Sequence, residues 1–253
     1  MSKVYFVGCG PGDPELITVK AQRLIRNADT VVYSGSLIPQ PVLDMCGGRL
    51  HDASGLVREE ITDILHKNAV SDLMVVRLHD GDPTIYGAIK EQMDALQDKG
   101  VECVVIPGVT SMLASSAALS TQLTLPGVTQ TIIITRIESR TDVPTKESIK
   151  SLSSHNCTMV LYLSIHLLHR IVQEAISGGY KPDTPVAVVY RASWEDQITL
   201  KGKLNDIVSK VHSAGITRTA IIIIGEVINP KHYEYSRLYD KEFSHGYRRA
   251  SKN

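Results

Sequence analysis

Residues 3–13, KVYFVGCGPGD, pass from an apolar run directly into a turn of glycines and one proline. An uninterrupted apolar run of this length is typical of a strand that is buried on both faces. An amphipathic helix is predicted next, over residues 15–27, and a second short apolar strand over residues 30–33. A buried strand, a helix and another buried strand in succession favour an α/β fold with a parallel sheet.

The same alternation continues to the end of the chain. In the first half it predicts strands at residues 73–78 and 101–106 and helices at 58–70 and 86–99. In the second half it predicts strands at 131–135, 159–163, 186–190, 198–203 and 220–224, with helices at 146–152, 167–177 and 204–212. We therefore predict two α/β domains, residues 1–119 with a largely parallel sheet and residues 120–230 with a mixed sheet. Residues 231–253 are predicted to form a polar tail.

The composition excludes several classes of protein. Lysine plus arginine and aspartate plus glutamate each number 27, so the formal net charge is zero, and we expect no nucleic-acid partner. The four cysteines form no C-x-x-C pair, and we expect no metal site. No apolar run approaches the roughly 20 residues that cross a bilayer, and the first residues lack the pattern of a secretory signal. We expect a cytoplasmic protein without a membrane partner.

Three glycine- and proline-containing turns follow predicted strands: GCGPGD at residues 8–13, HDGDP at 79–83 and PGVTS at 107–111. Ligands of open α/β sheets collect at the carboxyl ends of the strands, so these turns could line one pocket. The second turn places two acids around Gly81, which suits a cationic or hydroxyl-rich ligand better than a phosphate. Asp82 could equally cap the helix that follows.

The first turn argues against a dinucleotide. It resembles the G-x-G-x-x-G fingerprint, but Asp13 occupies the third glycine position and no acid follows residues 30–33 to bind a ribose. Pro11 also lacks the N–H that a pyrophosphate would accept. A nicotinamide- or flavin-dependent oxidoreductase is therefore disfavoured. A methyltransferase of the commoner Rossmann-like type is disfavoured by the same missing acid.

Three long motifs resemble the tetrapyrrole methylases: VGCGPGDPELITVKAQRLIRNADTVVY (residues 7–33), RLHDGDPTIYGAIKEQ (77–92) and PGVTS. Within that family, residues 33–39, 123–136, 184–197 and 236–248 resemble the branch that methylates carbon 11 of precorrin-4 or cobalt-precorrin-4. The resemblance implies S-adenosylmethionine-dependent C-methylation of a corrin precursor in cobalamin biosynthesis. Methylation of uroporphyrinogen III, or of another ring carbon, is the alternative within the family. A non-enzymatic nucleotide-binding module is the alternative outside it.

The resemblance also implies a site. It implies a homodimer with an active-site cleft between the two domains, where S-adenosylmethionine is held largely by backbone atoms. The cofactor contacts carried over are Pro11, Asp80, Gly81, Asp82, Ile85, Thr110, Ser111, Leu163, Ala192, Thr219 and Ala220. Because the substrate carries several carboxylates, we expect Arg136 and Arg140 to bind it. The catalytic base is not identified, although His79 beside the acidic turn is one candidate. Any cobalt would arrive within the substrate.

Overall fold

The computed structural model of the chain describes residues 2–250. The chain divides into two compact units. Unit 1 contains the chain up to Ala118 together with Tyr190–Ile198, and unit 2 contains Leu119–Val189 and the chain from Thr199 onward. A short segment from late in the sequence therefore belongs to the first unit, and no local pattern in the sequence indicates this.

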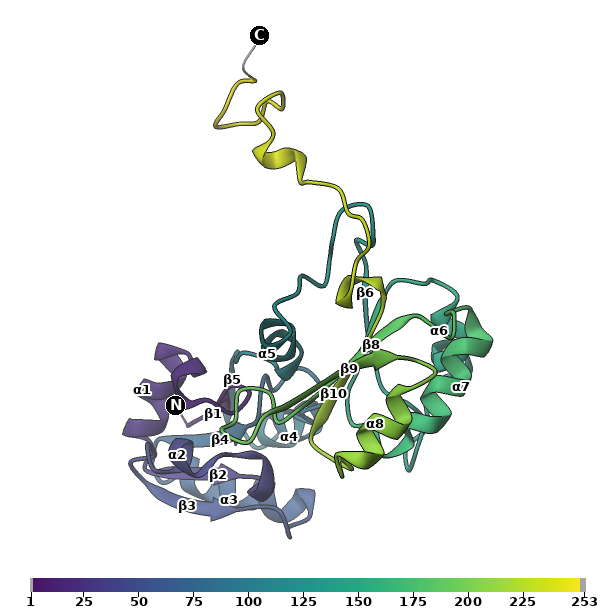
Figure 1. The fold of residues 1–253 in the computed structure, drawn as a ribbon. Helices are drawn as coiled ribbons and strands as arrows, with labels where there is room; N and C mark the ends of the chain where they lie inside the picture. The colour runs from purple at the N-terminus through teal and green to yellow at the C-terminus, as the bar shows by residue number, and fades with distance from the viewer. Residues whose placement is uncertain (1, 251–253) are drawn as a thin grey trace. The chain divides into compact units, whose positions relative to one another are not determined.

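Unit 1 is built on five parallel strands, which are labelled in Figure 1. Their order across the sheet is β3 (Arg49–Asp52), β2 (Thr30–Tyr33), β4 (Val75–His79), β1 (Lys3–Gly8) and β5 (Glu102–Ile106). β1 lies between β4 and β5, and its Val4 is in register with Val75 on one side and Cys103 on the other. The three turns noted in the sequence therefore follow three neighbouring strands, β4, β1 and β5, and lie at the carboxyl ends of these strands.

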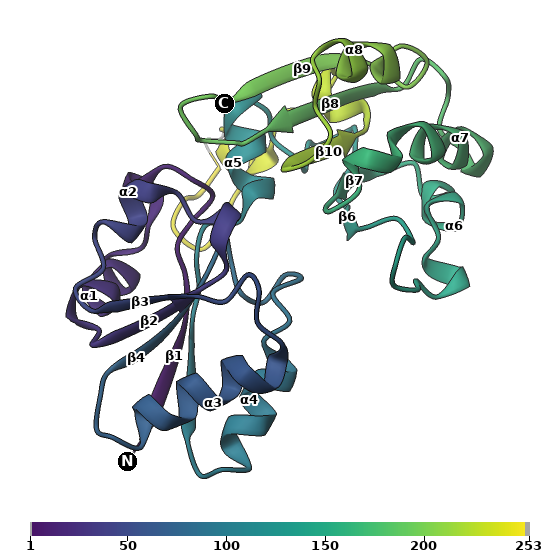
Figure 2. The same cartoon turned by 90° about the horizontal axis from the view of Figure 1, so that it is seen from below.

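Both faces of this sheet are covered, which explains the continuous apolar strands. Val7 on β1 belongs to a core that includes Ile25 of α1 (Val19–Asn27). Phe6, its neighbour in sequence, belongs to the opposite core with Leu65 of α3 (Arg58–Ala69). Figure 2 shows α1 and α3 on different sides of the strands. Because successive side chains of a strand point to opposite faces, burial on both faces favours apolar residues at consecutive positions.

The helix predicted at residues 86–99 begins later than expected. The structure has α4 at Lys90–Gln97, preceded by an irregular segment. Tyr86 and Ala88 have φ angles of +57° and +50°, in the left-handed region where an α-helix cannot continue. The residues between the acidic turn and α4 therefore form a strained loop rather than the first turns of a helix.

Other elements of unit 1 were not predicted or differ in their ends. The predicted helix at 15–27 is a 3-10 turn, Pro14–Leu16, followed by α1, which Thr18 caps by accepting a hydrogen bond from the Ala21 N–H at 3.2 Å. The elements absent from the prediction are β3, the 3-10 turn Gly35–Leu37, α2 (Gln40–Leu43) and α5 (Ser111–Ala118). These segments are short, and β3 carries a half-exposed, polar pattern that does not distinguish a strand from a loop.

Unit 2 has a mixed five-stranded sheet, as predicted. Its order is β6 (Ile132–Thr135), β7 (Thr158–Leu161), β10 (Ala220–Ile224), β8 (Pro185–Tyr190) and β9 (Ile198–Lys203). β6 runs parallel to β7, whereas β10 runs antiparallel to it, with Ile222 opposite Leu161. The helices are α6 (Ile149–Ser153), α7 (Leu168–Gly178) and α8 (Ile207–Ser213). The short 3-10 turns are Thr145–Glu147, Ile165–Leu167 and Glu226–Ile228. α6 and α7 lie side by side (Figure 1).

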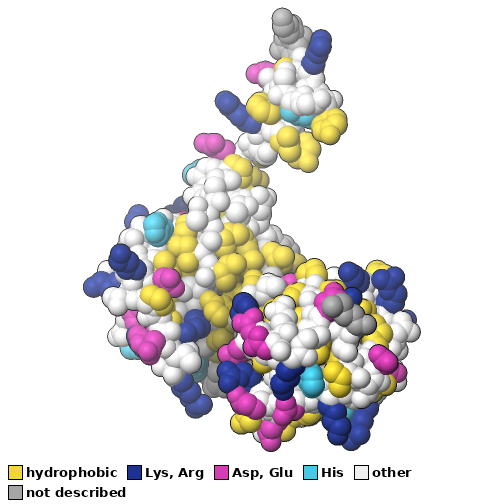
Figure 3. All heavy atoms as spheres, turned by 180° about the vertical axis from the view of Figure 1, so that it is seen from behind, with side chains coloured by type: hydrophobic (Ala, Val, Ile, Leu, Met, Phe, Trp, Pro, Cys, Tyr) yellow, Lys and Arg dark blue, Asp and Glu magenta, His cyan; other side chains and the backbone are white. Residues whose placement is uncertain are grey.

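Up to residue 250, the tail contains one short 3-10 turn, Arg237–Tyr239, and it is more aromatic than its description as polar suggests. Tyr235, Tyr239 and Tyr247 are largely exposed. In Figure 3 hydrophobic side chains are visible along this segment. None of the helices within residues 2–250 combines the length and the apolar character that crossing a bilayer requires.

Candidate functional site

The turns after β1 and β4 are joined directly by their backbones. The Gly81 N–H donates to the Gly10 carbonyl at 2.8 Å, and the Gly10 N–H donates to the Gly81 carbonyl at 3.3 Å. One step earlier, the Cys9 N–H donates to the His79 carbonyl at 2.8 Å. Backbone hydrogen bonds thus continue beyond the parallel strands, where Gly10 and Gly81 form an antiparallel bridge that joins the two turns.

The third turn meets the other two through glycines. A Cβ atom added to Gly108 would lie 2.1 Å from the Gly81 carbonyl oxygen, and one added to Gly8 would lie 2.6 Å from the same atom. Both distances are far below a van der Waals contact, so only glycine permits this approach of three backbones. Gly81 itself has a φ of +56°, but an added Cβ would have its nearest neighbour 3.7 Å away, at the Thr110 Cα. Glycine is therefore needed at Gly81 for its conformation rather than for space.

Asp82 braces this junction from within. Its Oδ1 accepts from the Thr84 N–H at 2.9 Å and from the Thr84 hydroxyl, and its Oδ2 accepts from the Gly108 N–H at 3.0 Å. Desolvation by itself raises the pKa of this carboxyl, but the three hydrogen bonds outweigh it and lower the pKa below the ordinary value. Because α4 begins only at Lys90, Asp82 does not cap that helix.

Asp80 differs from Asp82 in its surroundings. Its side chain is exposed, so it is the acid of this turn that a ligand can reach. The protein atoms around the carboxyl displace part of its hydration, and this desolvation raises its pKa, against smaller opposing effects of its own backbone N–H and of Arg77. The turn thus separates two roles that its sequence leaves open: one acid holds the backbone, and the other faces solvent.

His79 lies below the turn and is unsuited to act as a base. Its ring is buried and stacks on Phe6, with the ring centroids 6.0 Å apart. Burial, assisted by the charge of Arg77, lowers its pKa from 6.5 to about 3. Its Nε2 has no hydrogen-bond partner within residues 2–250. We conclude that His79 remains neutral in the core of unit 1.

Arg77 is the other buried basic residue of β4. Its guanidinium donates to the Ser34 hydroxyl at 2.9 Å, to the Gln92 side chain at 3.2 Å and to the Val32 carbonyl at 3.2 Å. Desolvation lowers its pKa to about 10, which still leaves it charged at neutral pH. Arg77 therefore ties β2 and α4 to β4 beneath the site.

A fourth segment of unit 1 reaches the first turn from far along the sequence. The Trp194 indole N–H donates to the Pro11 carbonyl at 2.9 Å, and the Asp13 N–H donates to the Ser193 hydroxyl at 2.9 Å. Ala192, directly before Ser193, is buried, and both of its neighbours in sequence, Arg191 and Ser193, have positive φ angles. The expected contacts Pro11 and Ala192 are thereby brought to the same side of unit 1.

The eight expected cofactor residues of unit 1 lie in or beside these four segments. The Ile85 N–H donates to the Asp82 carbonyl at 3.3 Å, and Thr110 is buried directly before α5. An added Cβ on Gly81 would have the Thr110 Cα and the Ser111 nitrogen as its nearest neighbours. These residues are Pro11, Asp80, Gly81, Asp82, Ile85, Thr110, Ser111 and Ala192. No local feature of the sequence joins Ala192 to the others.

The remaining three expected residues lie in unit 2. The antiparallel register of β7 and β10 brings the end of one strand and the beginning of the other to the same edge of the sheet. Leu163 follows β7, and Thr219 precedes Ala220, the first residue of β10. Leu163 and Thr219 have φ angles of +54° and +52°, and Leu163 is 64% exposed. Strained backbone of this kind is concentrated at functional sites.

The two expected substrate arginines behave differently. Arg136 donates to the Thr141 carbonyl at 3.0 Å and to the Asp142 carbonyl at 2.8 Å, so its guanidinium closes its own loop. Arg140, at the tip of that loop, is exposed. The structure thus uses Arg136 at least partly for loop shape, whereas Arg140 remains accessible.

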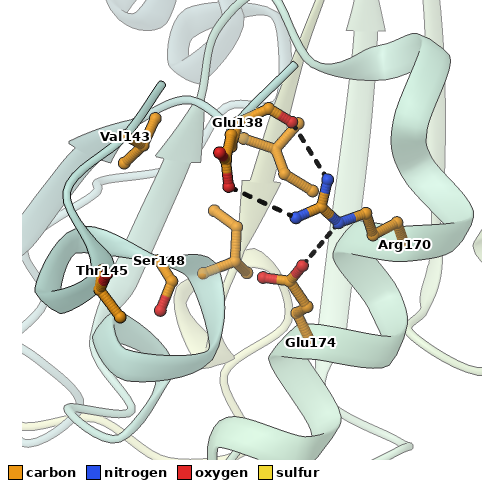
Figure 4. A pocket seen from close by; sticks show the side chains of 8 residues that line it. Glu138, Val143, Thr145, Ser148, Arg170 and Glu174 are labelled. Carbon is orange, nitrogen blue, oxygen red and sulfur yellow. Dashed lines mark hydrogen bonds and ion pairs between the residues drawn. The ribbon is translucent and has the colours of Figure 1, made fainter. Parts of the chain in front are cut away.

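Beside this loop unit 2 contains a pocket that sequence analysis did not indicate (Figure 4). Arg170, on α7, lies between two acids: it donates to Glu174 at 2.7 Å and to the Glu138 carbonyl at 3.2 Å, and the Glu138 carboxylate lies 3.9 Å away. The lining residues are Ile137, Glu138, Val143, Thr145, Ser148, Ile149, Arg170 and Glu174. Because its only arginine is already balanced by acids, this pocket is a poor receptor for a carboxylate-rich ligand.

Within residues 2–250, no three His, Cys, Asp or Glu side chains gather as metal ligands would. The four cysteines, Cys9, Cys46, Cys103 and Cys157, are all free thiols. Desolvation raises the pKa of each of them, so none is activated as a nucleophile.

The chain is similar to known proteins over nearly its whole length. Residues 3–208 match the family of Tetrapyrrole (Corrin/Porphyrin) Methylases. A cobalt-precorrin-4 C(11)-methyltransferase from Methanocaldococcus jannaschii is 49% identical over 252 residues, which are 99% of this chain and 97% of that protein. The X-ray structure of a cobalt precorrin-4 methyltransferase is 41% identical, with a TM-score of 0.88 over 90% of this chain and 96% of the other. A uroporphyrin-III C-methyl transferase from Thermus thermophilus, in complex with S-adenosylhomocysteine, is 30% identical, with a TM-score of 0.76 over 90% and 93%.

Proposed function

Because the chain belongs to the tetrapyrrole methylase family, we propose that it transfers a methyl group from S-adenosylmethionine to carbon 11 of precorrin-4 or cobalt-precorrin-4. This reaction is a step of corrin-ring synthesis in cobalamin biosynthesis. The observation that carries the proposal is the 49% identity, over nearly both full lengths, to a protein of this name. A uroporphyrinogen-III methyltransferase is the second candidate, favoured by the shared fold at 30% identity.

The junction of turns in unit 1 fits the cofactor chemically. S-adenosylmethionine carries an ammonium group, a carboxylate and two ribose hydroxyls but no phosphate, so it needs hydrogen-bond acceptors as well as donors, and a backbone that can be approached closely. Asp80 supplies an exposed carboxylate, and Gly81 leaves the main chain bare beside it. We propose that the eight residues of unit 1 named above bind the cofactor, together with Leu163, Thr219 and Ala220.

When bound, S-adenosylmethionine supplies an electrophilic methyl group on a positively charged sulfur. The residues of this chain have to hold that methyl in line with the nucleophilic ring carbon and keep water away. Such positioning contributes roughly 7–11 kcal/mol to lowering a barrier. The hydrogen bonds donated by Gly10, Gly81 and Gly108 join the three turns to one another. His79 takes no part as a base, because its pKa of about 3 and its burial keep it neutral and inaccessible.

We also propose that Arg140 binds a carboxylate arm of the substrate and that Arg136 shapes the loop that presents it. An exposed arginine at a loop tip can form a two-pronged contact with a carboxylate without first breaking a contact of its own. The protein is further proposed to act in the cytoplasm as a homodimer. Cobalt, where present, is part of the substrate.

The deciding experiment is incubation with S-adenosylmethionine that carries a ¹³C-labelled methyl group, with precorrin-4, cobalt-precorrin-4 and uroporphyrinogen III as separate substrates. We expect one labelled methyl on a precorrin-4 substrate, and carbon NMR of the product should place it at carbon 11. Comparing the two precorrin-4 forms shows whether cobalt is required. Labelling of uroporphyrinogen III alone, or of another ring carbon, would overturn the proposal.

A further inference from the structure

We propose that Trp194 is a positioning residue for the cofactor: it locks the first glycine turn to the segment that carries Ala192. The inference rests on the proposed function, since it concerns how the same site is assembled. Trp194 is 183 residues from Pro11 in the sequence, yet both belong to unit 1. Trp194 is also the only tryptophan in the chain.

The contact of Trp194 with the turn has two parts. The indole Nε1–H donates to the Pro11 carbonyl at 2.9 Å. The ring lies so close to the next residue that a Cβ atom added to Gly12 would be 2.1 Å from the Trp194 Cδ1 and 2.3 Å from its Nε1. Glycine at position 12 is therefore required for the indole to reach the backbone. The indole ring therefore packs directly against the backbone of the first turn.

The orientation of the indole is held by Arg191. The Arg191 guanidinium lies 4.6 Å from the centre of the Trp194 ring and 5.4 Å from that of Tyr190. Its Nη1 is paired with the Asp196 carboxylate at 2.6 Å, which keeps the cation in place. Cation–π contacts of this kind stabilise a ring in a particular orientation. The indole is thus supported by a charged pair and directed at one carbonyl.

A second bridge runs parallel to the first. The Asp13 N–H donates to the Ser193 hydroxyl, while the Ser193 N–H donates to the Gln197 side chain at 2.7 Å. Arg191 and Ser193 both have positive φ angles, of +44° and +71°. The surrounding contacts have to maintain these strained conformations, and Ala192 lies between them. Loss of Trp194 would therefore disturb both the first turn and the backbone of Ala192.

The test compares wild type with Trp194→Phe, which keeps an aromatic ring but loses the N–H, and Trp194→Ala, which loses both. Calorimetry should show S-adenosylhomocysteine binding weakened roughly three- to tenfold in Trp194→Phe, as expected for one neutral hydrogen bond. The loss in Trp194→Ala should be larger. In steady-state assays the KM for S-adenosylmethionine should rise in both variants, while the KM for the tetrapyrrole stays near wild type.

Fluorescence supplies an independent readout, because the emission after selective excitation of tryptophan reports on Trp194 alone among the ten tyrosines and one tryptophan of the chain. Titration with S-adenosylhomocysteine should change that emission and give the same dissociation constant as calorimetry. The matched control is Tyr180→Phe, which removes a buried aromatic donor to the Cys157 carbonyl in unit 2. It should lower stability and leave S-adenosylhomocysteine affinity unchanged.

The outcomes separate the inference from the function on which it rests. If wild type binds no S-adenosylhomocysteine, the proposed function fails. If wild type binds it and folded Trp194→Phe binds it equally well, only the positioning role fails. An equal loss of affinity in Tyr180→Phe, or an equal rise of both KM values in Trp194→Phe, would also overturn the positioning role.

Discussion

The carboxylate of Asp82 accepts a hydrogen bond from the Gly108 N–H at 3.0 Å, and this contact joins the turns that follow β4 and β5. Its other oxygen accepts from Thr84, within its own turn. With both oxygens engaged by the protein, Asp82 holds the shape of the edge at which the cofactor is proposed to bind. Asp80, two residues earlier, is left to face a ligand.

Replacing Asp82 should therefore cost stability. Asp82→Ala is expected to lower the free energy of unfolding by about 1–3 kcal/mol, because the Gly108 N–H loses a charged acceptor. Asp82→Asn should lose less, since an amide oxygen can still accept from Thr84. Folding lowers the pKa of Asp82, so its contribution is present above the ordinary value of 3.8 and is lost as the pH falls through the lower folded value. Urea unfolding should show the difference between wild type and Asp82→Ala shrinking in that acidic range; a difference independent of pH would contradict this account.

Gly81→Val should abolish S-adenosylhomocysteine binding while the protein remains folded. A β-branched residue is strongly disfavoured at a φ of +56°, so the turn would have to change its conformation. Gly81→Ala should be milder, because space exists for one methyl group. We expect it to lower the free energy of unfolding by about 1–2 kcal/mol, since alanine is disfavoured at a positive φ. Gly108→Ala provides the contrast: its Cβ would meet the Gly81 carbonyl at 2.1 Å and should disrupt folding itself. Circular dichroism and calorimetry on the three variants test this order, and wild-type affinity in Gly81→Val would remove the turn from the site.

His79→Phe should retain methyl transfer at neutral pH, because the wild-type ring is neutral and stacked on Phe6. The same change should alter acid stability. In wild type the pKa of His79 is 6.5 in the unfolded chain and about 3 in the folded protein, so between these pH values only the unfolded chain binds the proton. The free energy of unfolding therefore falls as the pH drops from 6.5 towards 3. The free energy of unfolding of wild type should therefore decrease more steeply than that of His79→Phe, by about 1.4 kcal/mol per pH unit. Loss of activity in the folded variant would restore His79 as a candidate base.

Arg136→Ala and Arg140→Ala should both weaken tetrapyrrole binding and leave S-adenosylhomocysteine affinity near wild type. Arg140 is exposed, so its loss is expected to cost about 0.2–1 kcal/mol of substrate binding. Arg136→Ala should also lower the melting temperature, because the loop carbonyls of Thr141 and Asp142 lose their donor. Steady-state kinetics and thermal melts separate the two effects. Wild-type turnover and KM in both variants would remove these arginines from the substrate site.

Calorimetry should show one S-adenosylhomocysteine site per chain and no binding of NADH. The first turn lacks the third glycine of a dinucleotide fingerprint, and its Pro11 has no N–H to donate to a pyrophosphate. The exposed carboxylate of Asp80 would also repel a pyrophosphate. Tight NADH binding without S-adenosylhomocysteine binding would end the methyltransferase proposal.

Much of unit 1 could be predicted from the sequence, because the information is local. An apolar run such as residues 4–7 favours a strand covered on both faces, and a glycine turn directly after it lies at the carboxyl end of that strand. The sequence did not predict the order of the strands, so it left open whether the three turns meet; the order β4-β1-β5 in the structure makes the strands neighbours. Helices on both faces of the first sheet, a mixed second sheet and the family resemblance were all predicted from such short patterns.

Tertiary structure alone decided how the residues of the site divide their work. Asp80 and Asp82 are chemically identical, and only the position of the Gly108 N–H makes one a brace and leaves the other exposed. His79 becomes a poor base because burial and Arg77 disfavour its charge. Trp194 reaches Pro11 because the chain returns to unit 1 at Tyr190–Ile198. The two residues in this contact are 183 positions apart in the sequence. Desolvation and long-range hydrogen bonds depend on which distant atoms become neighbours, and no local pattern of residues encodes that.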